Sequence, residues 1–155
     1  MRTPAFEIVP MKRTHLKACE AMVDVSEPWK TLHERVDFLK YIALKQAYVC
    51  TMGDVPAGFI IFSAEPVFAR GGYIRAVGVG PGMRRKGIGT LLLDFAENKI
   101  SRYSQNSYLC VSSFNRPGQI FYIKHGYIRV GNVPGLILPE ASEYIFWKKL
   151  KSSKS

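Results

Sequence analysis

A glycine-rich turn between a predicted strand and a predicted helix is the feature that most constrains how this chain can fold. In the segment Tyr73–Leu93, YIRAVGVGPGMRRKGIGTLLL, apolar residues alternate as far as Val79 and take helical spacing from Ile88 onward. The alternation slips by one residue, and Gly78 lies at this slip, where an interior glycine often marks a bulge or a close backbone approach. Helix N-termini present unpaired N–H groups, so the turn predicts an anion-binding, phosphate-type loop.

Two common glycine-rich signatures do not fit this turn. A P-loop needs Lys-Ser/Thr directly after its last glycine, and neither Gly82 nor Gly87 is followed by that pair. A dinucleotide fingerprint needs a third glycine where Leu92 or Met83 stands. Instead, the turn closely resembles the coenzyme A loop of the GCN5-related N-acetyltransferases, through the pattern Val79-x-Pro81-x-x-Arg84-x-x-Gly87-x-Gly89.

A second segment supports the same resemblance. Residues 107–113 are typical of a strand, and residues 116–125 of a short helix with Asn115 as N-cap and Gly126 as its left-handed C-terminal residue. The acetyltransferase family has Asn, then Phe-Tyr, then Gly-Phe/Tyr after its fifth strand. This chain matches that order with Asn115, Phe121, Tyr122, Gly126 and Tyr127.

The remaining pattern predicts a single domain over residues 1–155, with a frayed basic tail at 150–155. Strands are predicted at 5–9, 46–51, 56–63, 73–79, 107–113, 126–131 and 142–149, and helices at 14–24, 31–43, 85–103 and 116–125. This order resembles the acetyltransferase (GNAT) fold of the α/β (α+β) class. The resemblance implies a mixed central sheet of about six to seven strands with about four helices, splayed between strands 4 and 5.

Composition bears on the expected location, metal content and partners of the protein. Hydrophobic residues make up 47% of the chain without a run long enough to span a membrane, and three cysteines lack metal-ligand spacing, so we expect a cytoplasmic protein without a metal. The formal net charge of +10 raises the alternative of a nucleic-acid partner, but no reading motif or aromatic platform accompanies it. A polyanionic cofactor accounts for the three cations at 84–86.

The resemblance implies acetyl-CoA as the acyl donor and a set of residues that touch it. Tyr122 matches the family's general-acid tyrosine; the alternative is that it only contacts the cofactor sulfur or packs. Asn115 is either a cofactor contact or only an N-cap, and the cations are either phosphate ligands or an exposed charge run. The cofactor contacts implied are Val77, Gly78, Val79, Arg84, Arg85, Lys86, Gly87, Ile88, Gly89, Thr90 and Asn115.

The acceptor amine is not specified by the sequence. We tentatively assign Trp29, Glu65 and Tyr73 to the acceptor site. Trp29 could instead pack in the core, and either Glu65 or Tyr73 could hold a water that relays a proton. In the family, residues 25–33 and the loop 131–141 would contact the acceptor, and the apolar part of that loop could instead form a homodimer contact. Cys110 on a strand suggests an acyl-enzyme, but a small buried cysteine explains it better.

Three functional classes follow. The first is an acetyl-CoA-dependent N-acetyltransferase that moves an acetyl group to a primary amine of a small molecule, a peptide N-terminus or a lysine by direct attack. The second is a non-catalytic coenzyme A-binding sensor, and the third is a basic nucleic-acid-associated module.

Overall fold

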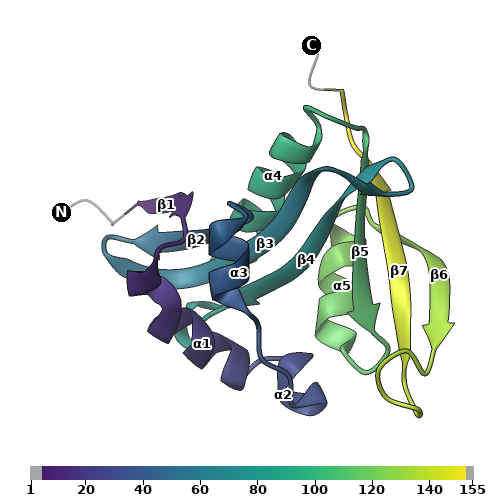
Figure 1. Ribbon diagram of the computed structural model, residues 1–155, viewed down its shortest axis with the longest axis horizontal. Helices are drawn as coiled ribbons and strands as arrows, with labels where there is room; N and C mark the ends of the chain where they lie inside the picture. The colour runs from purple at the N-terminus through teal and green to yellow at the C-terminus, as the bar shows by residue number, and fades with distance from the viewer. Residues whose placement is uncertain (1–4, 153–155) are drawn as a thin grey trace.

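One mixed sheet runs through residues 5–152, the part of the chain that the computed structural model describes (Figure 1). Its strand order is β1-β2-β3-β4-β5-β7-β6, so all seven predicted strands are confirmed. The strands are β1 (Phe6–Pro10), β2 (Ala47–Met52), β3 (Val55–Phe68), β4 (Gly71–Val79), β5 (Asn106–Ser112), β6 (Ile128–Pro134) and β7 (Ser142–Lys149).

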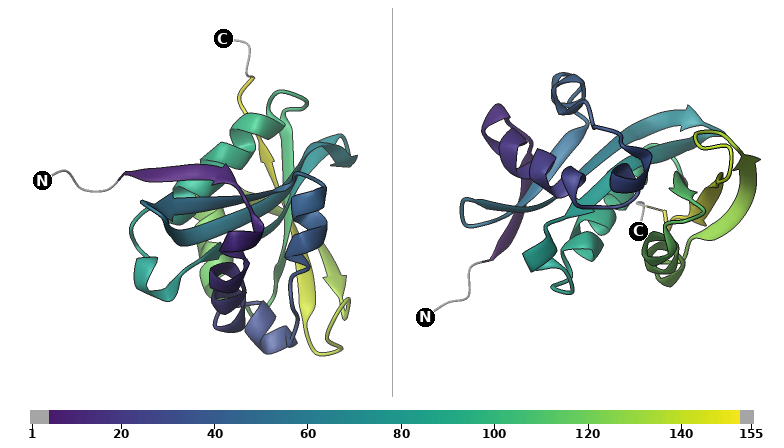
Figure 2. Two further views of the ribbon diagram at one scale, coloured as in Figure 1. Left: turned by 60° about the vertical axis from the view of Figure 1, so that its left-hand side comes forward. Right: turned by 90° about the horizontal axis from the view of Figure 1, so that it is seen from below.

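Helices cover both faces of the sheet (Figure 2). On one face, α1 (Leu16–Asp24), α2 (Trp29–Leu32) and α3 (Phe38–Ala43) pack on a core around Phe59. On the other face, α4 (Ile88–Ile100) and α5 (Arg116–Lys124) border a larger core. Both cores form because alternate residues of the central strands point to opposite faces.

The one parallel pair among the described strands, β4 and β5, separates toward its C-terminal ends (Figure 1). Pairing between these strands is confined to Gly72–Ile74 of β4 and Ser107–Leu109 of β5. Beyond that point β5 stays with β7, with which it pairs along its whole length. The sheet therefore opens between β4 and β5, as the family resemblance implied.

The irregularity predicted in β4 exists, but it lies at Arg75 and not at Gly78. Ile61 of β3 pairs with Ala76 and the next residue pairs with Ile74, so Arg75 is the extra residue of the bulge. A Cβ atom on Gly78 would lie 2.2 Å from the Phe59 ring, so packing against that ring explains this glycine.

Two predicted helices were too long. The helix predicted over 31–43 is broken, because His33 has a left-handed φ of 54° and Asp37 starts α3 by accepting a hydrogen bond from the Lys40 N–H at 3.2 Å. The helix predicted over 85–103 begins only at Ile88, since Arg85 and Gly87 have φ of 66° and 81°.

The C-terminal third corrects two further predictions. The acceptor-side loop predicted over 131–141 is shorter, because Gly131–Pro134 belongs to β6. Leu150, predicted to be in the frayed tail, is 6% exposed and donates its N–H to the Gln105 carbonyl at 2.7 Å. Residues 151 and 152 follow without regular structure, and the rest of that predicted tail lies outside the described residues. Across 5–152, no helix has the length and apolar character needed to cross a membrane.

Candidate active site

A cleft of about 580 Å³ occupies the opening between β4 and β5. Both faces of the sheet contribute to it. From the α4 and α5 side come the glycine-rich turn and the first turns of α5, and from the other side comes the segment that joins α1 to α2. Its walls include Ser26, Trp29, Arg75, Val77, Gly78, Val79, Arg84, Gly89, Cys110, Asn115, Phe121 and Tyr122. A molecule that enters the cleft from one face of the sheet can therefore meet a molecule that enters from the other face, at the point where β4 and β5 separate.

The glycine-rich turn presents backbone to this cleft. Gly87 has a left-handed φ of 81°, which only glycine adopts without strain, and it precedes the first residue of α4. A Cβ atom on Gly89 would lie 3.1 Å from the Phe121 ring, so a side chain there would fill the space beside α5. The N-terminus of the 13-residue α4, with its outward N–H groups, suits an anion.

The predicted donor-site side chains do not all face the cleft. Arg85 and Lys86 are exposed beside the turn, where they lie within reach of solvent but outside the cleft wall. Ile88 is 1% exposed and packs in the core. Arg84 reaches across the cleft and donates to the Ser26 hydroxyl at 3.1 Å. The turn is therefore tied to the loop between α1 and α2, a contact that no sequence pattern indicated.

Helix α5 brings Tyr122 to the cleft. The Asn115 side chain accepts from the Gly118 N–H at 3.1 Å, which confirms the predicted N-cap, and Gly126 has the predicted left-handed φ of 93°. The Tyr122 ring packs edge-on against Phe121 and Tyr127. Burial raises the pKa of the Tyr122 hydroxyl, so this group stays protonated at neutral pH. It therefore has the protonation state required of an acid.

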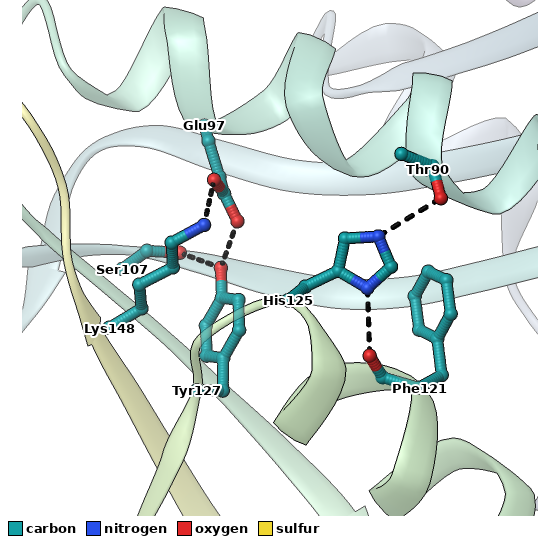
Figure 3. Close-up of polar contacts among 7 residues, drawn as sticks. All are labelled: Thr90, Glu97, Ser107, Phe121, His125, Tyr127 and Lys148. Atoms are coloured by element: carbon teal, nitrogen blue, oxygen red, sulfur yellow. Dashed lines mark hydrogen bonds and ion pairs between the residues drawn. The ribbon is translucent and has the colours of Figure 1, made fainter.

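Side-chain hydrogen bonds lock α4 against α5 (Figure 3). The His125 ring bridges the two helices, with Nε2 2.9 Å from the Thr90 hydroxyl and Nδ1 2.8 Å from the Phe121 carbonyl. Thr90, predicted to contact the cofactor, thus uses its hydroxyl to join the helices. The histidine, to which the sequence assigned no role, holds the first turn of α4 at a fixed place beside Tyr122.

A second polar cluster lies farther along the same interface (Figure 3). Glu97 of α4 accepts from Lys148 of β7 at 2.7 Å and from the Tyr127 hydroxyl at 3.0 Å, and Tyr127 also lies 2.7 Å from the Ser107 hydroxyl. This cluster fixes α4 on β5 and β7. The α4 side of the opening is consequently braced at two points.

The opposite face carries a different set of groups. Trp29 is 8% exposed and packs on Phe59, which confirms the core alternative. It also lines the cleft, and its contact with an acceptor stays a prediction. Tyr73, predicted for the acceptor site, does not line the cleft, and its hydroxyl lies near the Cys110 thiol, which does. Burial first, and then the nearby Cys110, raise the pKa of Tyr73. Cys110 was predicted to be buried, which is wrong: its side chain on β5 is exposed, and partial desolvation still raises the pKa of its thiol, although Tyr73 partly offsets this.

Glu65 does not belong to this site. It lies near the end of β3 and lines a separate hollow with Lys45, Lys99 and Tyr103. The prediction was wrong because β3 continues to Phe68, so position 65 is carried past the splay. No group of His, Cys, Asp or Glu side chains suited to a metal ion occurs within residues 5–152.

The fold and the cleft define a class of α/β proteins in which a parallel strand pair opens beside a glycine-rich turn and the N-terminus of a helix. The model of the acetyltransferase (GNAT) family matches residues 14–127, more than half of the chain. The chain therefore belongs to this family, and it is an acyltransferase with acetyl-CoA as its acyl donor. No curated protein matches it.

Solved structures share the fold. Ard1 from Thermoplasma volcanium is 19% identical, with a TM-score of 0.78 over 96% of this chain and 99% of that one. The PaiA N-acetyltransferase from Thermoplasma acidophilum, in complex with coenzyme A, is 20% identical, with a TM-score of 0.74 over 94% and 99%. The ribosomal-protein-S18-alanine N-acetyltransferase from Escherichia coli is 15% identical, with a TM-score of 0.72 over 97% of each chain.

Proposed function

We propose that this protein transfers the acetyl group of acetyl-CoA directly to a primary amine, without an acyl-enzyme intermediate. The observation that carries the proposal is the cleft through the β4–β5 opening, which joins the glycine-rich turn and Tyr122 to a separate approach past Trp29. Donor and acceptor can then occupy one space from opposite faces. Direct attack needs this arrangement, whereas a carrier residue would need only one entrance.

Donor binding rests on backbone groups. The coenzyme A pyrophosphate takes the N–H groups of the turn that includes Gly87 and Gly89, and Arg85 and Lys86 neutralise its charge from solvent. The pantetheine arm lies along the C-terminal half of β4, whose partner-free edge faces the opening beyond Ile74 and offers N–H and C=O groups to an extended chain. Val77, Gly78 and Val79 are the residues along this edge.

Tyr122 supplies the proton that the leaving thiolate needs. Its hydroxyl has no hydrogen bond to another described residue, it lies on the cleft wall, and its raised pKa keeps it protonated. Cys110 is exposed, but partial desolvation raises the pKa of its thiol and leaves little thiolate, which makes it a poor nucleophile for an alternative route. The acetyl group therefore passes straight from sulfur to nitrogen.

The acceptor is an amine from a small molecule, a peptide N-terminus or a lysine side chain. The structural neighbours include a ribosomal-protein-S18-alanine N-acetyltransferase, which makes a peptide N-terminus one worthwhile class to test. We place the enzyme in the cytoplasm, and we assign its basic surface to the cofactor rather than to nucleic acid.

The test is a calorimetric titration with acetyl-CoA followed by thiol release against four amines. These are spermidine, 2-phenylethylamine, a tetrapeptide with a free N-terminus, and N-α-acetyl-lysine. Binding together with amine-dependent release supports the proposal. Binding without release from any amine favours the sensor alternative, and absence of binding overturns the donor-site assignment.

A further inference from the structure

A buried carboxylate stands beside the acceptor approach without a cation to neutralise it. Glu143 at the start of β7 is 8% exposed. Within residues 5–152 the one ion pair joins Lys148 to Glu97, so no Lys, Arg or His pairs with Glu143. Burying an unpaired carboxylate is costly, and such a group is retained where something else meets its charge.

The sheet register sets the direction of this side chain. Glu143 lies directly opposite Ser112 of β5, and directly opposed residues of an antiparallel pair project on the same face. Leu109 and Val111 belong to the core on the α4 side, so Cys110 and Ser112 point to the other face. Glu143 therefore points to the face of α1, α2 and α3, one residue pair beyond Cys110, which lines the cleft.

A second polar group near Glu143 also lacks a partner. The Ser112 hydroxyl is fully buried and meets no hydrogen-bond partner of full geometry in the described chain. It lies close enough to the Glu143 carboxylate to stabilise its charge, but not in bonding alignment. A carboxylate and a hydroxyl that share one face of the sheet and leave bonding capacity unused match an ammonium group, which donates three hydrogen bonds.

Charged and titratable groups approach Glu143 from several neighbouring elements. Burial raises the pKa of Glu143, the Ser112 hydroxyl partly offsets this, and Glu34 from the segment between α2 and α3 raises it further. Tyr73 and Cys110 also feel the Glu143 charge, and β6 places only Val133 opposite it. Arg75 of β4 is engaged with the Tyr41 and Tyr73 rings.

We propose that Glu143 is the anionic group that attracts the acceptor's ammonium to the cleft and receives its proton before acetyl transfer. This inference rests on the proposed function. It makes the favoured acceptor a strongly basic primary amine, because only such an amine arrives with the positive charge that Glu143 and Ser112 can bind. Glu34, whose charge acts on Glu143, adds to the attraction.

The proton and electron balance is complete with the groups named. One ammonium proton passes through a bridging water to the Glu143 carboxylate, and the freed lone pair forms a C–N bond at the thioester carbonyl. Collapse of the tetrahedral intermediate breaks the C–S bond, and the thiolate takes the Tyr122 proton. The nitrogen then gives its extra proton to the Tyr122 phenolate, which restores the phenol. The products are the amide, the thiol and one proton, which Glu143 releases to solvent.

Glu143→Gln tests this role, with Glu65→Gln as the matched control outside the cleft. With the panel amine that releases thiol fastest, Glu143→Gln should lower kcat/KM about 100-fold at pH 7. The deficit should shrink at pH 9.5, where solution supplies more neutral amine, and acetyl-CoA affinity should be unchanged. Glu65→Gln should match the wild type at both pH values.

Each outcome decides the proposal. A deficit of the same size at both pH values, or none, overturns the role of Glu143 while the proposed function stands. Failure of the wild type with every amine overturns both. Thermal unfolding distinguishes a loss of catalysis from a folding defect. Because the substitution replaces a buried unpaired carboxylate with an amide, the midpoint of unfolding should be equal or higher.

Discussion

The two sides of the β4–β5 opening are built differently. The donor side uses backbone groups of one continuous segment, the turn before α4, and two polar clusters brace it against α5 and β7. The side proposed for the acceptor collects side chains from four separate places: the segment around Trp29, the bulge at Arg75, Cys110 on β5 and, by the further inference, Glu143 on β7. A site for a constant donor is local in sequence, and a site for a particular acceptor is assembled by the fold.

The largest effect should come from filling the backbone cradle. Gly89→Val places methyl groups where the first added atom already approaches the Phe121 ring at 3.1 Å, and it blocks the approach of the pyrophosphate. We expect acetyl-CoA affinity to fall by about 100-fold or more, equivalent to ~3 kcal/mol, in a calorimetric titration.

Gly82→Ala is the matched control for that change. Gly82 has no atom within 4 Å of an added Cβ, so affinity should not change. Equal losses in both variants would mean that the loop acts through its flexibility and not as a cradle.

The next effect concerns chemistry on the donor side. Tyr122→Phe should lower kcat by about 10- to 100-fold while acetyl-CoA affinity is retained, because only the proton for the leaving thiolate is removed. Since the raised pKa of Tyr122 keeps it protonated, its removal should not alter the neutral part of the pH profile. Tyr103→Phe, at a 56% exposed position away from the cleft, is the control. Unchanged kcat in Tyr122→Phe would reduce Tyr122 to a packing residue.

A smaller effect should follow from loosening the donor side. Thr90→Val and His125→Ala each remove the bond between α4 and α5, so each should lower the free energy of unfolding by about 1 kcal/mol. Urea denaturation of the two single variants and the double variant measures the coupling between them. Fully additive losses would show that the bond contributes nothing of its own.

The smallest effect is expected at Cys110 on the acceptor side. Cys110→Ala should keep kcat within about two-fold, because direct attack uses no acyl-enzyme and partial desolvation raises the pKa of this thiol. Mass spectrometry of the wild type with acetyl-CoA alone should find no acetylated Cys110. A labelled cysteine together with an inactive variant would replace direct attack by a two-step transfer.

The local geometry of the proposed donor side could be predicted from sequence because its signals are local. Gly87 needs a left-handed φ, Asn115 caps α5, and Tyr122 follows at fixed helical spacing, so short motifs encode their geometry. The predicted boundaries of α4 failed because apolar periodicity does not reveal that Arg85 also has positive φ. Asp37 was an available N-cap signal for the break before α3 that the longer periodic pattern obscured.

The acceptor side could not be predicted because it depends on register. Glu143 gains its place only when β7 pairs with β5 in one alignment, and shifting that pairing by one residue would turn it to the other face. The prediction for Glu65 was wrong because β3 extends farther than its apolar run suggested, which carries this residue away from the cleft. The Arg84 contact with Ser26 joins loops distant in sequence, and no local pattern signals it.

A crystal structure of the protein with coenzyme A is the most direct test of the account. We predict the pyrophosphate on the N–H groups of the turn that contains Gly87 and Gly89, and the thiol between β4 and β5 beside the Tyr122 hydroxyl, with the Trp29 side of the cleft left open for the acceptor. Coenzyme A bound on the face of α1 and α3, or with its thiol away from the opening, would contradict the assignment of donor and acceptor to opposite sides of the sheet.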